Sequence, residues 1–121
     1  MAFDWTEYLN LANYIQQQGN RSNVNREAAY RCAVSRAYCA AFCFARNDAR
    51  DNHGWTPGNN PQDHQDLPDF LDGIQKSDVA DKLTELRQWR NNCDYDDNPP
   101  SNLMMMSIGA ISNANYVISN V

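Results

Sequence analysis

The apolar residues of this chain recur every three or four positions, which is the spacing of helices with one buried side. No segment shows the strict alternation that is typical of a strand. We therefore expect an all-α fold, an antiparallel bundle of four to five helices that forms one domain over residues 1–121. The pattern predicts helices at about Asp4–Gln18, Asn23–Asn47, Gln65–Gln75, Asp78–Asp94 and Ser101–Ser119.

Polar residues mark the expected helix ends. Asp4 followed by Glu7 resembles a capping box at the first helix. Ser22 or Asn23 is expected to cap the second helix and Ser77 the fourth.

Two prolines add to these end signals. Pro68 is expected in the first turn of the third helix, and Pro99-Pro100 stops any continuation of the fourth. Residues 48–63, rich in Gly, Pro and Asn, form a loop longer than most. We expect partial disorder in this loop, with Trp55 as an anchor.

The second helix is expected at the centre of the bundle. Residues 32–44 are apolar nearly all round the helix, and a surface helix would have one polar side. Its alanines permit close approach by neighbouring helices.

Arg90 interrupts the apolar stripe of the fourth helix. At 100° per residue, it falls with four apolar residues within a sector of roughly 80°. Its guanidinium stays charged, and an unpaired buried charge is costly, so it needs a partner, a cleft or another chain. The polar residues Asn91, Asp94 and Tyr95 follow at once, which places the candidate site at this helix end. The apolar residues of the stripe are Val79, Leu83, Leu86 and Cys93.

Arg36 is a second arginine among apolar positions, on the second helix. Asp94 is four residues after Arg90 and is also a candidate partner for Arg36 across a helix interface. We predict a charge-assisted Arg36–Asp94 pair that joins the second and fourth helices. If Arg36 lies away from every carboxylate, that pair is excluded.

The net charge of −5 does not favour nucleic-acid binding by the chain as a whole. However, six of the eight arginines lie between residues 21 and 50, whereas the acids gather in residues 63–97. These arginines do not form a single stripe. They fit either a solvated helix surface or a basic surface that a second copy of the chain completes.

The cysteines Cys32, Cys39, Cys43 and Cys93 lack the spacing of a zinc site, and we expect reduced, mostly buried thiols. We predict no metal and no cofactor. No stretch of 18 apolar residues suggests a membrane span, and the first residues do not resemble a secretion signal, so we expect a cytoplasmic protein.

Two motifs carry a family resemblance. Residues 35–42 read Ser-Arg-Ala-Tyr-Cys-Ala-Ala-Phe, and residues 90–96 read Arg-Asn-Asn-Cys-Asp-Tyr-Asp. Over roughly residues 5–118 the chain resembles small bacterial and archaeal HEPN-domain proteins. His64 matches a histidine that these proteins often carry before the third helix. Cys39 stands where the family usually has Tyr, and Cys93 where it usually has Ala.

The resemblance implies a helical bundle that forms a homodimer. Many members are metal-independent endoribonucleases of toxin–antitoxin systems, beside a nucleotidyltransferase-type antitoxin, or of defence systems. Their signature is an Arg followed, four to six residues later, by a His, with the site formed across the dimer. Arg90 matches the Arg, whereas Tyr95 stands at the position of the His.

Two functions remain open from the sequence. In a ribonuclease, Arg90 would contact RNA phosphate, Asn91 would orient the substrate and Tyr95 would donate a proton or hydrogen bond. His64 would supply the imidazole if the fold brings it to the end of the fourth helix. In the alternative, a non-catalytic HEPN-like bundle binds RNA, a nucleotide or a protein partner, and Arg90, Asp94 and Tyr95 chiefly fasten the bundle or the dimer.

Overall fold

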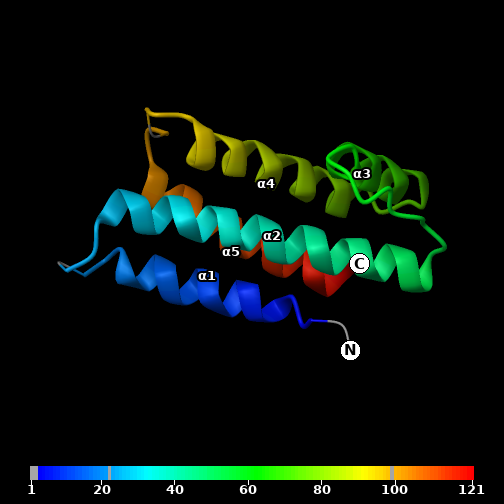
Figure 1. Ribbon diagram of the computed structural model, residues 1–121, viewed down its shortest axis with the longest axis horizontal. Coiled ribbons are helices and arrows are strands. Elements are labelled where there is room, and N and C mark those ends of the chain that lie inside the picture. Colours follow the sequence, from blue (N-terminus) through cyan, green and yellow to red (C-terminus); the bar gives the residue numbers. More distant parts are fainter. Residues whose placement is uncertain (1–2, 22, 99) are drawn as a thin grey trace.

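The computed structural model describes residues 3–21, 23–98 and 100–121. Figure 1 shows neighbouring long helices running in opposite directions, apart from α2 and α5, which run the same way. The described residues contain no strand, so the predicted all-α class and helical bundle are confirmed. The helices are α1 (Thr6–Gln18), α2 (Arg26–Asn52), α3 (Asp63–Gly73), α4 (Ser77–Tyr95) and α5 (Leu103–Asn120).

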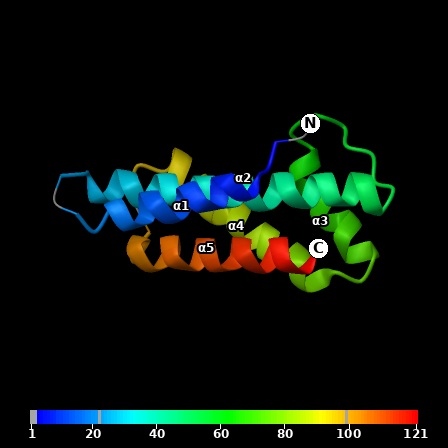
Figure 2. The same cartoon turned by 90° about the horizontal axis from the view of Figure 1, so that it is seen from below.

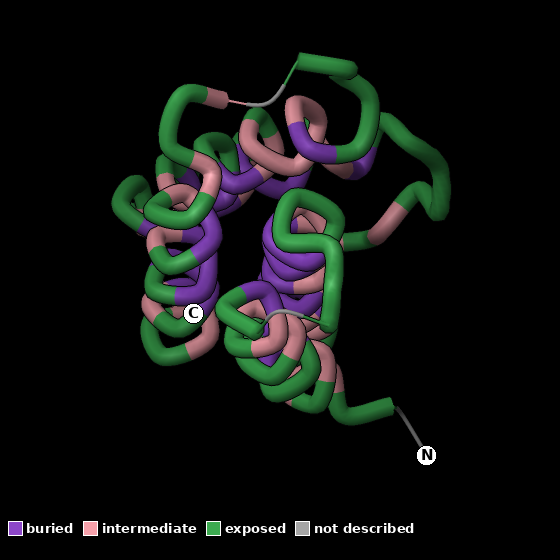
Figure 3. The backbone as a smooth tube through the Cα atoms, turned by 90° about the vertical axis from the view of Figure 1, so that its left-hand side faces the viewer, coloured by how far each residue is buried: buried purple, intermediate pink, exposed green. Residues whose placement is uncertain are grey.

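The α2 helix is the centre of the bundle, as its apolar middle predicted. It packs against α1, α4 and α5, whereas α3 packs mainly against α4 (Figures 1 and 2). Figure 3 shows the buried residues gathered where the helices face one another. Alanine side chains without any exposed surface allow this close approach of the neighbouring helices to α2. They are Ala33, Ala37, Ala40, Ala41, Ala45 and Ala49.

The α2 helix begins later and ends later than expected. Its cap is Asn25, whose side chain accepts a hydrogen bond from the backbone N–H of Ala28 at 2.9 Å. The predicted cap at Asn23 is therefore wrong, and Ser22 lies outside the described residues. The helix continues to Asn52 because no Gly or Pro interrupts it before Gly54, whose φ of 75° ends helical geometry.

Three of the other helix starts also differ from the sequence-based expectation. The Asp4 carboxylate accepts from Thr6 at α1, so the Asp4–Glu7 capping box does not form. Ser77 is the first residue of α4 and donates its hydroxyl to Asp72, so it is not a cap. The α5 helix is capped by Asn102, which accepts from the N–H of Met105.

The loop between α2 and α3 spans residues 53–62, so it is shorter than the predicted 48–63. Trp55 packs against the core, with its ring 6.2 Å from that of Phe70. The carboxylate of Asp63 accepts hydrogen bonds from the N–H groups of Gly58 and Asn59, both at 2.9 Å. Asp63 is only 6% exposed, so its side chain holds the loop end against α3.

The early start of α3 also moves Pro68. Because the helix begins at Asp63, Pro68 lies inside it and not in its first turn, as had been predicted. In the described part of the chain, no helix is both long enough and apolar enough to cross a membrane.

We expect Asp63→Ala to lower the free energy of unfolding by about 1–3 kcal/mol, because two backbone donors of the loop lose their acceptor. Chemical denaturation would measure the loss. Asp69→Ala, on the exposed side of the same helix, is the matched control and should stay within about 0.5 kcal/mol of wild type. Equal effects of the two changes would show that Asp63 does not fasten the loop.

Candidate functional site

Arg90 is half-buried on α4 and has no acidic partner in the described chain. Its guanidinium carbon lies 5.0 Å from the ring centre of Tyr38 and 6.0 Å from that of Tyr95. These cation–π contacts are each worth about 0.5–2 kcal/mol. This is less than the several kcal/mol that it costs to remove a charged guanidinium from water. The fold thus positions this charge between two aromatic rings without neutralising it.

The hydrogen-bonding capacity of Arg90 is also unused. Its Nε is the one buried side-chain nitrogen or oxygen of the described chain that lacks a hydrogen-bond partner. The two terminal nitrogens of the guanidinium also lack a hydrogen-bond partner within the described chain. Unlike Nε, they are not buried, so they reach solvent. The unsatisfied Nε costs about 1–3 kcal/mol inside the fold, and the terminal nitrogens are the part of the guanidinium that an anion can contact from solvent.

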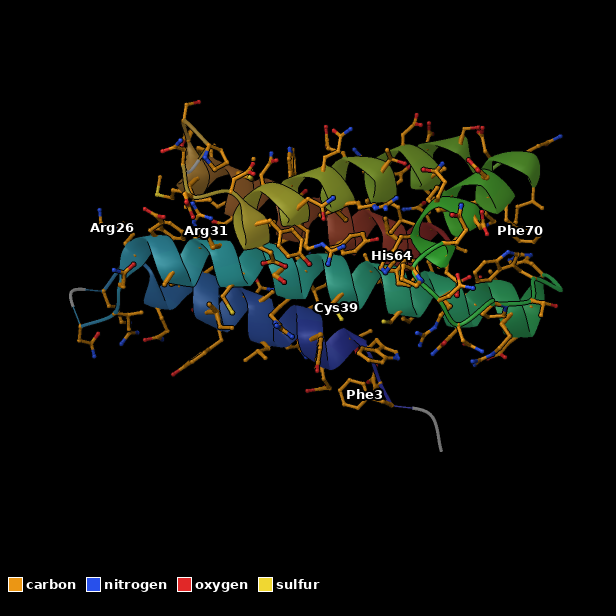
Figure 4. The ribbon with its side chains drawn as sticks, turned by 45° about the horizontal axis from the view of Figure 1, so that its top comes forward. Phe3, Arg26, Arg31, Cys39, His64 and Phe70 are labelled. Carbon is orange, nitrogen blue, oxygen red and sulfur yellow. The ribbon has the colours of Figure 1, made fainter. Side chains whose placement is uncertain are left out.

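His64 lies in the first turn of α3 and faces α2, as Figure 4 shows. Its Nδ1 is 2.5 Å from the hydroxyl of Tyr38, and its ring stacks on Phe42 with centres 4.2 Å apart. Burial lowers the pKa of His64, and the charges of Arg90 and Arg87 lower it further. The imidazole is therefore neutral near pH 7 and able to accept a proton.

Tyr38 connects Arg90 with His64, because both contact its side chain. It is 3% exposed, and burial raises the pKa of its hydroxyl far above the usual range, so it remains a neutral phenol. If the imidazole Nδ1–H donates to the Tyr38 oxygen, Nε2 keeps a free lone pair; the other tautomer makes Nε2 a donor. The tautomer that His64 adopts against Tyr38 therefore decides whether Nε2 can accept a proton or donate one.

Sequence reasoning did not assign Tyr38 to the site. The available signal was its position within the motif at residues 35–42 and one helical turn before Phe42. Because a tyrosine on an apolar helix face usually belongs to the core, the pattern alone did not separate it from packing residues.

The two other predicted residues lie nearer to solvent. Tyr95 is the last residue of α4 and is 73% exposed, with its ring within cation–π range of Arg90. Asn91 is half-buried and, within the described chain, shares no hydrogen bond with Arg90. Arg90 thus contacts the rings of Tyr38 and Tyr95, and His64 is connected with it through the hydroxyl of Tyr38.

The predicted Arg36–Asp94 pair is wrong. The exposed Asp94 carboxylate accepts a hydrogen bond from the Ser35 hydroxyl at 3.1 Å, and the described chain has no ion pair between Asp94 and Arg36. Arg36 instead lies over the ring of Tyr8, at 5.7 Å from its centre. Adjacent helical residues point about 100° apart, so Ser35 faces α4 while Arg36 faces α1.

Arg31 holds the end of α4 in place and was missed by sequence reasoning. Its Nη1 donates to the carbonyl oxygens of Cys93 and Asp96, at 2.8 and 2.6 Å, and its Nη2 to that of Asp97 at 3.1 Å. Its Nε pairs with Glu27 one turn earlier. Figure 4 shows the side chain of Arg31 directed from α2 toward this end of α4. These acceptors are backbone atoms, which no residue pattern reveals.

The described residues contain no cluster of three or more His, Cys, Asp or Glu side chains that could hold a metal ion. Cys32, Cys39, Cys43 and Cys93 are all free thiols.

Comparisons with protein-family models, curated proteins and solved structures find no match for this chain. The resemblance to HEPN-domain proteins accordingly rests on the motifs at residues 35–42 and 90–96, and it stays a prediction.

We expect Arg90→Gln to raise the pKa of His64 toward its ordinary value of 6.5, because a nearby positive charge is removed. An NMR titration of the imidazole would measure the shift. Arg50→Gln is the matched control, since Arg50 is exposed and pairs with Asp51. An unchanged His64 pKa in Arg90→Gln would mean that the two groups do not interact.

Proposed function

We propose that this chain is a HEPN-like RNA-binding protein that cleaves RNA without a metal ion, within a toxin–antitoxin or defence type system. The observation that carries this proposal is the pairing of an arginine lacking an acidic partner with a neutral imidazole, joined through one buried tyrosine. Arginine suits phosphate because its fork of N–H donors matches two phosphate oxygens.

The proposed reaction uses the 2′-hydroxyl of RNA as its own nucleophile. Nε2 of His64 takes the hydroxyl proton, and the 2′-oxygen forms a bond to the adjacent phosphorus. The bond from phosphorus to the 5′-oxygen breaks, and that oxygen takes a proton from the Tyr95 hydroxyl or from water as it leaves. The products are a 2′,3′-cyclic phosphate and a 5′-hydroxyl, with no oxidant or metal required. Arg90 stabilises the negative charge that develops on the phosphate oxygens.

The remaining predicted residues have supporting roles in this proposal. Tyr95, exposed beside Arg90, would donate a hydrogen bond to phosphate or to the leaving oxygen. Asn91 would orient the substrate. A homodimer and a nucleotidyltransferase-type antitoxin are further parts of the proposal, which the family resemblance implies. In such a dimer each protomer would bring its own Arg90, Tyr38 and His64.

A non-catalytic bundle that binds a protein partner is the second candidate. It is favoured by the exposed side chains of Met104, Met105 and Ile108 on α5, at 44, 52 and 45%. Exposed methionines are common on surfaces that bind protein partners. This candidate predicts that Arg90 can be replaced without loss of binding to the partner.

We expect wild-type protein to cleave single-stranded RNA in excess EDTA and to leave 2′,3′-cyclic phosphate ends. Arg90→Gln should reduce the rate by about 10²–10³-fold, because the developing phosphate charge loses its cation. His64→Asn should reduce it by about 10²–10⁴-fold, because the base is lost. The rates and the end groups can be measured by gel electrophoresis and mass spectrometry.

The exposed Arg50→Gln is the control for a lost positive charge, and circular dichroism would check the folding of each variant. Tyr95→Phe separates the two possible proton carriers, because a loss as large as that of His64→Asn would assign the main role to Tyr95. Cleavage that persists in Arg90→Gln, or that requires a metal ion, would exclude the proposed reaction.

A further inference from the structure

Arg90, Tyr38 and His64 form the Arg90 cluster. Outside this cluster, one face of α2 carries further arginines that have no acidic partner. At 100° per residue, Arg36, Cys39, Cys43 and Arg46 fall within a sector of roughly 80°. This sector lies between the side of α2 that packs on α1 and the side that carries Tyr38. Figure 2 shows α5 along the opposite side of α2, and Figure 4 labels Cys39 on the face in question.

The two arginines of this face lie over aromatic rings of α1. The guanidinium carbon of Arg36 is 5.7 Å from the ring centre of Tyr8, and that of Arg46 is 5.8 Å from that of Trp5. Arg46 also donates from Nε to the side chain of Asn47, a neutral group, at 3.1 Å. In the described chain neither arginine pairs with a carboxylate.

Two other arginines of α2 have acidic partners, whereas Arg26 donates to the backbone carbonyl of Gly19. Arg31 pairs with Glu27 and Arg50 with Asp51. Acidic partners are thus available along the same helix, yet Arg36 and Arg46 are held by aromatic rings. Such contacts fix the position of a guanidinium and leave its N–H groups able to bind an anion.

This face adjoins the Arg90 cluster. The pKa of the Cys39 thiol is lowered, first by the neighbouring Cys43 side chain and then by the charges of Arg36, Arg46 and Arg90. Tyr38, which contacts Arg90, and Cys39, which lies in this sector, are successive residues of α2, so the face lies next to the Arg90 guanidinium. A chain with net charge −5 consequently concentrates positive charge in one place.

Aromatic rings border the outer edge of the face. Phe3, Trp5 and Tyr8 contact one another edge to face, with ring centres 4.8, 5.5 and 5.1 Å apart. Phe3 is 52% exposed. Unpaired nucleobases stack on such rings, whereas the bases of a duplex are already stacked on each other.

A hollow of about 250 Å³ follows beside these rings, with Phe3 and Trp5 in its wall. Its wall also contains Asp4, Asp48 and Asp51. Carboxylates repel phosphate but accept hydrogen bonds from the amino groups of bases. The hollow therefore suits a base at the end of a bound strand and does not suit a continuing backbone.

We propose that single-stranded RNA crosses this arginine–aromatic face, defined by Arg36 and Arg46 of α2 with Phe3, Trp5 and Tyr8. One phosphate binds Arg90, the following phosphates bind Arg36 and Arg46, and bases stack on the aromatic rings. This inference rests on the proposed function and specifies its substrate as a single strand that extends from Arg90 toward the start of α1.

Fluorescence anisotropy with 2′-O-methyl RNA, which lacks the nucleophile, tests the path. The probes are a labelled single strand of about ten nucleotides, within the usual range of single-strand sites, and a labelled dinucleotide. We expect Arg36→Gln with Arg46→Gln to weaken binding of the longer strand about tenfold. The loss should be smaller for the dinucleotide, which reaches little beyond Arg90. The slope of the logarithm of the binding constant against the logarithm of the salt concentration should become less steep by about 1.4, because two phosphate contacts are lost.

The charge-matched control is Arg21→Gln with Arg26→Gln, which removes two exposed arginines: Arg21 precedes α2, and Arg26 lies about 80° outside the sector. Trp5→Leu should weaken binding of the longer strand by roughly fivefold or more, because base stacking on the indole ring is lost. If the Arg36 and Arg46 variant binds like the control, or if duplex RNA binds as tightly as the single strand, the path is wrong. Different results would exclude the proposed function itself. They are binding of both probes by Arg90→Gln as tightly as by wild type, or binding of neither probe by wild type.

Discussion

The contact on which the candidate site depends is the buried side chain of Tyr38. Its ring lies under the guanidinium of Arg90 from α4, and its hydroxyl is hydrogen-bonded to His64 from α3. Because Tyr38 itself belongs to the central helix, the relative positions of the cation and the imidazole are set by the packing of α3 and α4 on α2. A neutral phenol suits this role, since it can share a proton with the imidazole without adding a charge that would neutralise Arg90.

The end of α4 is held in a complementary way. A helix end leaves carbonyl groups without partners, and Arg31 binds several of them from α2. The charge of Arg31 is thereby used within the fold, whereas the charge of Arg90 is not. Arg31 thus uses its N–H groups to hold the end of α4, whereas Arg90, which belongs to α4, has no such partners. Of these two arginines, Arg90 is the one that remains available to a ligand.

The helical class could be predicted from the spacing of the apolar residues. The central position of α2 could be predicted because apolar residues surround the middle of that helix on nearly all sides. Arg90 could be singled out for the same reason, since a charge inside an apolar stripe is visible in the sequence. The Arg36–Asp94 pair was predicted wrongly because helix periodicity gives directions around one helix but not the rotation of two helices relative to each other. Tyr38 and Arg31 were missed because their partners are a histidine from another helix and backbone carbonyl groups.

The acidic net charge and the arginine–aromatic face act over different distances. Ten of the fifteen acids lie between residues 63 and 97, mainly on α3 and α4, and they repel RNA at long range. At physiological ionic strength, charges act over only about 8 Å, so a phosphate near α2 is governed by Arg36, Arg46 and Arg90. Aromatic rings strengthen this selectivity, because they hold the arginines without neutralising them and add stacking that salt does not screen. An acidic protein can therefore present a local site for a polyanion, provided that its arginines form no ion pairs, as is the case for Arg36 and Arg46 on this face of α2.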